Sequence, residues 1–254
     1  MTLTGTGSAP FVLAWVYSVF WPNHAWPKAS QTESALSATS SAKNQFGTST
    51  FHVEGCHRTE HSGVLVVLHG KGGQTQLSSL AKRFKLLACS RNLAVIAPAA
   101  SSVNQNWPFE RAGGDKQDMF LNELLKNELP QRIKLKKNFE THFVGISAGA
   151  TFLMGDFYPR HAHRYVGSAI ALCGGSWPTD QSKLKEKTNF NKLPLAIRIS
   201  SKDFLFQQSE AGIRAYKAEG IPILQRITHE QGHCNFSLTE ATNELLTELI
   251  PVRH

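Results

Sequence analysis

The sequence predicts an α/β fold, with a mostly parallel central sheet and helices on both of its faces. Apolar runs bounded by turn residues recur along the chain and are apolar on both sides, as in strands buried within a parallel sheet. Segments with helical apolar spacing separate these runs, which indicates βαβ units with right-handed crossovers. In such a sheet, reactive side chains are expected at the carboxyl ends of the strands.

The composition is that of one large globular domain. The chain has 254 residues, of which 41% are hydrophobic and 18% are charged, and its glycines and prolines form no repeat. The formal net charge is +8, and part of it is concentrated in the segment 132–137. No nucleic-acid-binding motif accompanies this segment, so we expect a solvated basic turn and no nucleic-acid partner.

The N-terminal part differs from the rest of the chain. Residues 1–27 contain no Lys, Arg, Asp or Glu, and their apolar run over 11–21 is shorter than the ~20 residues of a membrane span. The run suits a signal-peptide core, although no positive charge precedes it. We expect a secreted or periplasmic protein, with a membrane-anchored or cytoplasmic one as the alternative and membrane contact only if this segment is retained. The Ser/Thr/Ala-rich stretch 28–47 predicts a linker, and residues 48–254 predict the folded domain.

The expected elements follow one another as strand and helix. A short edge strand around Phe51 and Val53 precedes the first buried strand. Further strands are expected over 63–68, 93–98, 139–144, 166–173, 193–199 and 221–227, and helices over 77–88, 119–125, 211–217 and 238–249.

The motif Gly-x-Ser-x-Gly lies at the end of the strand expected over 139–144, where Ser147 stands between Gly145 and Gly149. In a nucleophile elbow the serine occupies a sharp turn between strand and helix, and small residues flank it because the two backbones approach closely. Ser147 is therefore the candidate nucleophile. The first N–H groups of the following helix point at a developing oxyanion.

A glycine-rich loop, His69-Gly70-Lys71-Gly72-Gly73, follows the first buried strand. It lacks the Lys-Ser/Thr ending of a phosphate-binding Walker loop. In a hydrolase, a loop of this kind supplies a backbone N–H group to the oxyanion hole.

A serine hydroxyl needs a general base, which is usually an imidazole held by a carboxylate. Asp203 directly follows the penultimate strand and His233 follows the last one, which gives the chain order Ser, Asp, His. Asp180 and Glu186 are alternative acids, and His229 is an alternative base. We favour His233 because the glycine before it lets the backbone turn the ring over the sheet edge.

The four cysteines, Cys56, Cys89, Cys173 and Cys234, show neither a C-x-x-C motif nor zinc-ligand spacing. No metal site is therefore predicted. An even number permits up to two disulfides in an exported protein, and the sequence does not determine their pairing.

From about residue 50 to 250 the chain resembles the polyhydroxybutyrate depolymerase and feruloyl esterase branch of the α/β-hydrolases. The matching residues are Leu68-His69-Gly70, Gly145-Ile146-Ser147-Ala148-Gly149-Ala150, Asp203 and Gly232-His233. The resemblance implies an α/β-hydrolase fold with Ser147 as nucleophile, His233 as base and Asp203 as orienting acid. It also implies that the N–H groups of Ala148 and Lys71 bind the oxyanion.

The chain departs from this branch at two positions. Related depolymerases often have a cysteine where this chain has Lys71. Some feruloyl esterases pair a cysteine before the serine with one after the histidine, but Ile146 precedes Ser147 here, so that particular disulfide is excluded.

Together these features predict a serine carboxylic-ester hydrolase that needs no metal or organic cofactor. Thioesterase, lysophospholipase or peptidase activity with the same residues is the alternative, as is a noncatalytic hydrolase-like binding protein. The interval between Cys173 and Leu193 is too short for a helical lid domain. We therefore expect short-chain, aromatic or polymeric esters as substrates, with Trp107 and Trp177 lining the site.

Overall fold

The computed structural model describes residues 36–44, 47–58, 60–100, 106–107, 114–184 and 190–250. The segment 1–27, for which the sequence predicts a signal peptide or anchor, lies outside the described residues. Within the described part, no helix is both long and apolar enough to cross a membrane.

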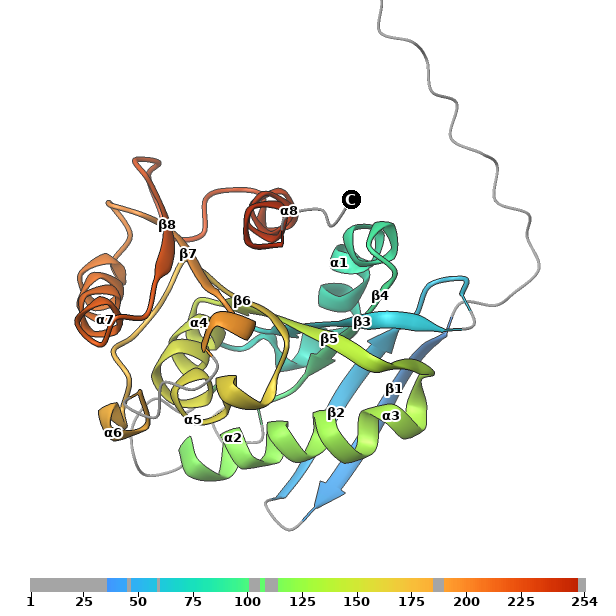
Figure 1. The fold of residues 1–254 in the computed structure, drawn as a ribbon. Helices are drawn as coiled ribbons and strands as arrows, with labels where there is room; N and C mark the ends of the chain where they lie inside the picture. Colours follow the sequence, from blue (N-terminus) through green and yellow to red (C-terminus); the bar gives the residue numbers. More distant parts are fainter. Residues whose placement is uncertain are drawn as a thin grey trace, which may run out of the picture. The chain divides into compact units, whose positions relative to one another are not determined.

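Eight strands form one sheet in the order β1-β2-β4-β3-β5-β6-β7-β8 (Figure 1). The strands β3 to β8 run parallel to one another, whereas β2 is antiparallel to both of its neighbours, β1 and β4. This mostly parallel sheet confirms the predicted fold class. The bounds are β1 Ser37–Asn44, β2 Gly47–Glu54, β3 His61–Leu68, β4 Leu93–Pro98, β5 Leu135–Ile146, β6 Gly167–Leu172, β7 Leu195–Ser200 and β8 Ile223–Thr228.

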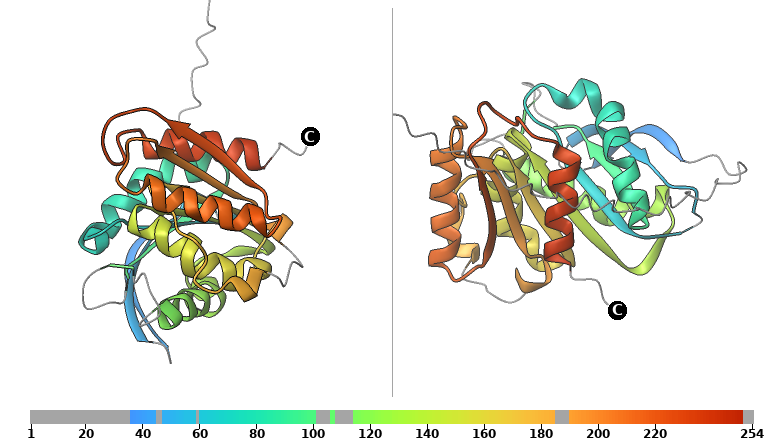
Figure 2. Two further views of the ribbon diagram at one scale, coloured as in Figure 1. Left: turned by 90° about the vertical axis from the view of Figure 1, so that its left-hand side faces the viewer. Right: turned by 90° about the horizontal axis from the view of Figure 1, so that it is seen from above.

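Helices cover both faces of the sheet, as Figures 1 and 2 show. One face is covered by α1 (Leu77–Ser90) and α8 (Leu238–Leu249), whose apolar side chains share a core cluster with β3 and β5. The other face is covered by α2 (Gly114–Glu123), α4 (Ala148–Phe152), α5 (Tyr158–His161) and α7 (Phe206–Ala218). Single π-helical turns over Leu124–Glu128 and Leu153–Phe157 continue α2 into α3 (Leu129–Arg132) and α4 into α5. The short α6 spans Gln181–Leu184.

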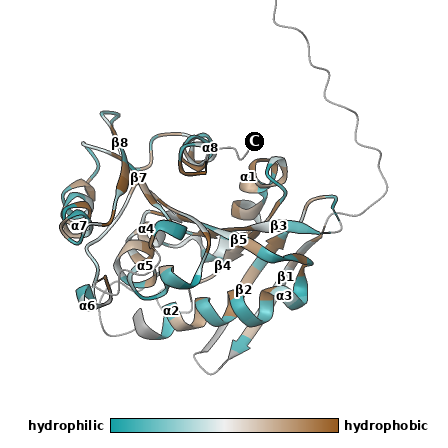
Figure 3. Ribbon diagram, viewed as in Figure 1, coloured by the Kyte–Doolittle hydropathy of each residue, from teal (hydrophilic) through white to brown (hydrophobic). Residues whose placement is uncertain are grey.

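The apolar runs of the sequence lie at the centre of the sheet. The side chains from Val64 to Leu68 in β3 have no exposed surface. Hydropathy along the ribbon accordingly shows apolar central strands and helices with more polar outer sides (Figure 3). Burial on both faces is the physical reason why these strands lack the alternating pattern of half-exposed strands.

The structure corrects part of the expected linker 28–47, because Ser37–Asn44 forms β1 and pairs along its length with β2. β2 is therefore not the edge strand that the sequence predicts. Small residues such as Ala42, which is buried, pack toward the protein, while Lys43 is exposed. A Ser/Thr/Ala-rich stretch is thus able to form an outer strand, and a charged side chain on it protects the edge.

A buried carboxylate links β2 to β1 and α1. Glu54 accepts hydrogen bonds from Ser37 (2.6 Å) and His52 (2.8 Å), and Lys85 of α1 contacts its other oxygen at 2.9 Å. Burial alone raises the pKa of Glu54, but these three donors outweigh it and lower the pKa to about 2. In the folded domain the carboxylate is therefore ionised at any pH well above 2.

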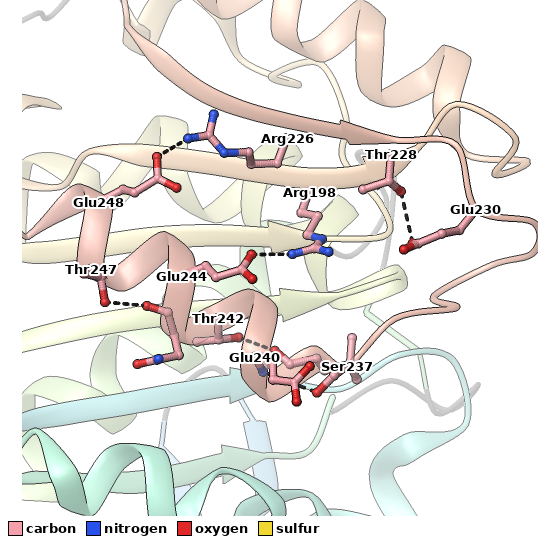
Figure 4. A network of polar contacts seen from close by, with 12 residues as sticks. Arg198, Arg226, Thr228, Glu230, Ser237, Glu240, Thr242, Glu244, Thr247 and Glu248 are labelled. Carbon is pink, nitrogen blue, oxygen red and sulfur yellow. Dashed lines mark hydrogen bonds and ion pairs between the residues drawn. The ribbon is translucent and has the colours of Figure 1, made fainter. Parts of the chain in front are cut away.

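Ion pairs connect α8 to the last two strands (Figure 4). Arg198 of β7 contacts Glu244 at 2.5 Å, and Arg226 of β8 contacts Glu248. The Ser237 hydroxyl accepts a hydrogen bond from the Glu240 N–H group and caps the helix. Both ends of the loop between β8 and α8, which carries His233, are therefore attached to regular structure.

Candidate active site

Ser147 stands at the turn between β5 and α4, with φ 53° and ψ −111°. A positive φ is uncommon for a residue other than glycine, and it marks a sharp, strained turn. The neighbouring backbones are too close for larger residues: a Cβ on Gly149 would lie 2.4 Å from the Leu68 carbonyl oxygen. The sequence motif thus has the strand-turn-helix geometry that a nucleophile elbow requires.

Ser147, His233 and Asp203 form a continuous chain of hydrogen bonds. His233 Nε2 lies 2.8 Å from Ser147 Oγ, and His233 Nδ1 lies 2.8 Å and 2.9 Å from the two carboxylate oxygens of Asp203. An ionised carboxylate only accepts hydrogen bonds, so Nδ1 carries the proton and Nε2 is left to accept the serine proton. The arrangement is chemically able to activate the serine hydroxyl.

Asp203 is held rigidly at the end of β7. Its side chain has no exposed surface, whereas that of His233 is 27% exposed. The Leu205 N–H group donates a hydrogen bond to Asp203 Oδ1 at 2.9 Å. The carboxylate thus has fixed partners on both sides, which orients the imidazole.

The alternative residues lie elsewhere. His229 Nδ1 contacts the hydroxyl of Ser201 at 2.9 Å on the surface. Asp180 accepts hydrogen bonds from Ser182 at the start of α6. Glu186 lies outside the described residues. The structure therefore brings His233 and Asp203, rather than His229 or Asp180, to Ser147.

Two disulfides are formed, Cys56–Cys89 and Cys173–Cys234. The second joins the residue after His233 to the end of β6, which lies next to β5 in the sheet. Cys173, Cys234 and His233 bring three potential metal-binding atoms within 4.8 Å of one another. Both sulfurs are bonded to each other, however, and are not available as the thiolates that zinc prefers.

His69 shapes the glycine-rich loop beside the serine. The ring is buried, its Nδ1 donates to the Gly70 carbonyl at 2.7 Å, and its Nε2 accepts from the Ala100 N–H group at 3.0 Å. Burial lowers the pKa of His69 and keeps the ring neutral, as this pair of hydrogen bonds requires. The next residue, Gly70, lies beside the elbow: a Cβ there would be in ordinary van der Waals contact with the Ser147 Cβ, at 3.5 Å.

A cavity of about 620 Å³ opens over Ser147. Gly70, Lys71 and Ala148 line it together with Ser147 and His233, so both residues proposed as oxyanion donors reach it. Its remaining wall residues are Trp107, Ile146, Thr151, Phe204, Leu205, Gln208 and Cys234.

The two tryptophans expected to line the site have different positions. Trp107 is in the cavity wall, buried between His69 and Phe152, with ring centroids 5.2 Å and 4.8 Å away. Trp177 is 42% exposed and is not among the residues that line this cavity.

Phe204 is a wall residue that the sequence did not indicate. Its ring lies 4.6 Å from that of His233 and is 76% exposed. Its position directly after Asp203 is the one signal in the sequence that would have identified it, because residues at a strand end surround the same site.

No protein-family profile matches the chain, and no curated protein is similar to it in sequence. Solved structures are similar in fold. A feruloyl esterase module from Clostridium thermocellum aligns with a TM-score of 0.64 and 13% identity, over 87% of this chain and 90% of that one. Esterase PE8 aligns with a TM-score of 0.60 and 19% identity, over 78% and 97%. An S-formylglutathione hydrolase from Agrobacterium tumefaciens aligns with a TM-score of 0.62 and 14% identity, over 85% and 94%. The chain therefore has the α/β-hydrolase fold.

Proposed function

We propose that this α/β-hydrolase-fold protein is a serine carboxylic-ester hydrolase that forms an acyl-enzyme on Ser147. The observation that carries the proposal is the hydrogen-bond chain from Ser147 through His233 to Asp203 at the carboxyl ends of three strands. Fold alone does not determine activity, so the argument rests on these side chains and on the cavity above them. The esterase names of the similar structures agree with the proposal.

In this mechanism, Ser147 Oγ attacks the ester carbonyl while His233 Nε2 accepts its proton. Asp203 remains ionised, holds the imidazole in the required tautomer and stabilises the imidazolium that forms. His233 then donates the proton to the departing alcohol. In the second half-reaction it accepts a proton from water, which attacks the acyl-enzyme and releases the carboxylic acid.

The oxyanion is assigned to two backbone N–H groups. Ala148 is the first residue of α4, and the first N–H groups of a helix have no partner within it. Lys71 supplies the second group from the glycine-rich loop, which the buried His69 ring holds against the elbow. Donors fixed in this way stabilise the tetrahedral intermediate without reorganisation.

The cavity favours short or aromatic acyl groups. Phe204 and Trp107 provide aromatic surfaces, and among the wall residues that the structure describes only Lys71 is a lysine, arginine, aspartate or glutamate. The segment between β6 and β7 contains only short helical turns among the described residues, so no lid domain there encloses a long acyl chain. Trp177 takes no part in this proposal because it lies outside the cavity wall.

A fluorophosphonate probe tests the nucleophile directly, because it phosphonylates an activated serine. We expect the wild-type protein to be labelled and Ser147→Ala to remain unlabelled, with ester hydrolysis reduced by about 10⁶-fold. Ser201→Ala is the matched control, since Ser201 contacts His229 on the surface and should leave labelling unchanged. Labelling that survives in Ser147→Ala would place the chemistry on another residue.

The rates at which the wild-type protein hydrolyses a panel of substrates distinguish the remaining candidate activities. Aryl acetate, aryl butyrate, a feruloyl ester, an aryl thioester and emulsified triolein compare acyl length, aromatic character and leaving group. We expect the aryl and feruloyl esters to be the best substrates. Triolein as the best substrate would contradict the open-site argument, and a wild-type protein without labelling or turnover would be a binding protein.

We also propose that the protein works in an oxidising compartment outside the cytoplasm. All four cysteines are paired in disulfides, and such bonds persist mainly in exported proteins. Intact-mass measurement of protein from its native host provides the test. We expect a mature chain that lacks residues 1–27 and whose mass is lower than that of its reduced form by the four hydrogens lost in two disulfides. Free thiols on the purified protein would contradict the assignment.

A further inference from the structure

A second cavity, of about 650 Å³, lies far from Ser147. The π turn after α2, the strand β5 and the segment leading into β6 form its walls. Thr141 of β5 lines it, whereas Ile146, five residues further along the same strand, lines the first cavity. At ~3.3 Å per residue the two cavities are separated by roughly 16 Å of strand, so they are separate sites.

The described wall residues of this second cavity include three cations. Lys126, Lys137 and Arg164 come from three different elements, and no aspartate or glutamate is among the described residues that line the cavity. In the described part of the chain, none of the three forms an ion pair with a carboxylate. Two nearby acids contact other groups: Glu123 accepts a hydrogen bond from Asn127 and interacts electrostatically with Tyr165, and Glu140 lies 3.4 Å from His142 Nε2.

A buried amide provides a directed donor in the same cavity. Asn122 is only 5% exposed, and the Tyr165 hydroxyl donates to its Oδ1 at 3.1 Å. Burial raises the pKa of Tyr165, so the hydroxyl keeps the proton that it donates. Asn122 lines the cavity, and its Nδ2 donates no hydrogen bond to another described residue, so the amide is available to a ligand.

The rest of the wall is apolar. Leu125 is buried, the rings of Phe139 and Tyr165 are partly buried, and Val166 remains 47% exposed. A carboxylate or phosphate group of a ligand forms ion pairs with the cations and accepts a hydrogen bond from the amide. An apolar part of the same ligand packs on the apolar wall and removes it from water. We propose that this cavity binds a small organic anion, in which a carboxylate or phosphate group is attached to an aromatic body.

Isothermal titration calorimetry with benzoate and phenyl phosphate tests the proposal. Two partial probes serve as controls: inorganic phosphate lacks the aromatic ring, and benzyl alcohol lacks the anionic group. We expect both aromatic anions to bind the wild-type protein more tightly than either partial probe. Binding should weaken as salt is added, because the cations are exposed. The preferred anion distinguishes a carboxylate site from a phosphate site.

A charge-matched pair of variants locates the binding. Lys137→Ala with Arg164→Ala removes two wall cations, and we expect at least about tenfold weaker binding of the aromatic anions. Lys82→Ala with Arg83→Ala removes the same charges from the exposed side of α1 and should leave the affinity unchanged. Fluorophosphonate labelling of Ser147 should be the same in all three proteins, so this test is independent of the proposed esterase activity.

Two results would overturn the proposal. One is a wild-type protein that binds neither aromatic anion at millimolar concentration. The other is an equal loss of affinity in both double variants, which would mean that the anions respond only to the net charge of +8.

Discussion

The disulfide Cys173–Cys234 lies next to the proposed general base, and its removal separates a stabilising role from a positioning role. The perturbation is the double substitution Cys173→Ala with Cys234→Ala. The chain offers a matched comparison in Cys56→Ala with Cys89→Ala. All four half-cystines are paired, but only Cys234 lines the cavity over Ser147.

The expected loss of stability is similar for the two pairs. The disulfides join residues 61 and 33 positions apart in the sequence. Because loop-closure entropy grows only with the logarithm of loop length, either loss should lower the free energy of unfolding by about 4 kcal/mol.

The expected loss of activity differs. Without Cys173–Cys234, the 27%-exposed His233 side chain loses the covalent attachment beside it and is held by its hydrogen bonds to Asp203 and Ser147, by the Phe204 ring and by the attachments at the loop ends. A displacement of about 1 Å of a catalytic group costs up to about 100-fold in rate, so we expect kcat/KM to fall by about 10- to 100-fold. The pair Cys56→Ala with Cys89→Ala should retain near wild-type turnover while it is folded.

Urea unfolding and aryl-acetate hydrolysis on the three proteins, at a temperature where all are folded, check both quantities. The reasoning would be refuted if the two pairs lost activity equally, since a common cause such as general loosening would then explain the loss. Unchanged turnover in Cys173→Ala with Cys234→Ala would show that Asp203 and the loop ends are sufficient to position His233.

Other predictions follow from the same structure. Asp203→Asn should lower kcat by up to about 10⁴-fold, because the amide no longer fixes the imidazole tautomer. His229→Ala should leave aryl-acetate hydrolysis unchanged, and a large loss of hydrolysis in that variant would instead assign the base to His229. Phe204→Ala should lower kcat/KM several-fold more for a feruloyl ester than for an aryl acetate, because the exposed ring borders the cavity in which we propose that the acyl group binds. Parallel steady-state kinetics with the two substrates measure this difference. Glu54→Gln should reduce thermal stability at pH 7, and thermal unfolding across pH should show the difference from wild type shrinking between about pH 5 and pH 2. The sign follows because the folded-state pKa of Glu54, about 2, lies below the ordinary value of 4.5, so its stabilisation is present above 4.5 and is lost as the pH falls toward 2. A constant difference from pH 7 to pH 2 would contradict the role of its charge.

The fold class was predictable from the sequence because it depends on local patterns. Runs that are apolar on both faces form β3 and β4, and a helix predicted over 238–249 forms as α8 with those bounds. β1 was missed because a Ser/Thr/Ala-rich stretch carries no apolar signal of its own. Its strand conformation depends on pairing with β2, which the local sequence does not encode.

The sequence by itself determined the sharp turn that carries Ser147, because the close approach of β5 and α4 requires glycine at Gly145 and Gly149, two residues on either side of it. It also predicted that His233 lies beside Ser147 and Asp203 beside His233, since strand ends meet at one edge of a parallel sheet. Only the tertiary structure decided the pairing of Cys173 with Cys234, the place of Phe204 in the cavity wall and the exclusion of Trp177 from it. These features depend on how loops from distant parts of the chain pack over the sheet edge. Such contacts are set by three-dimensional neighbours rather than by residue spacing, so no local pattern contains them.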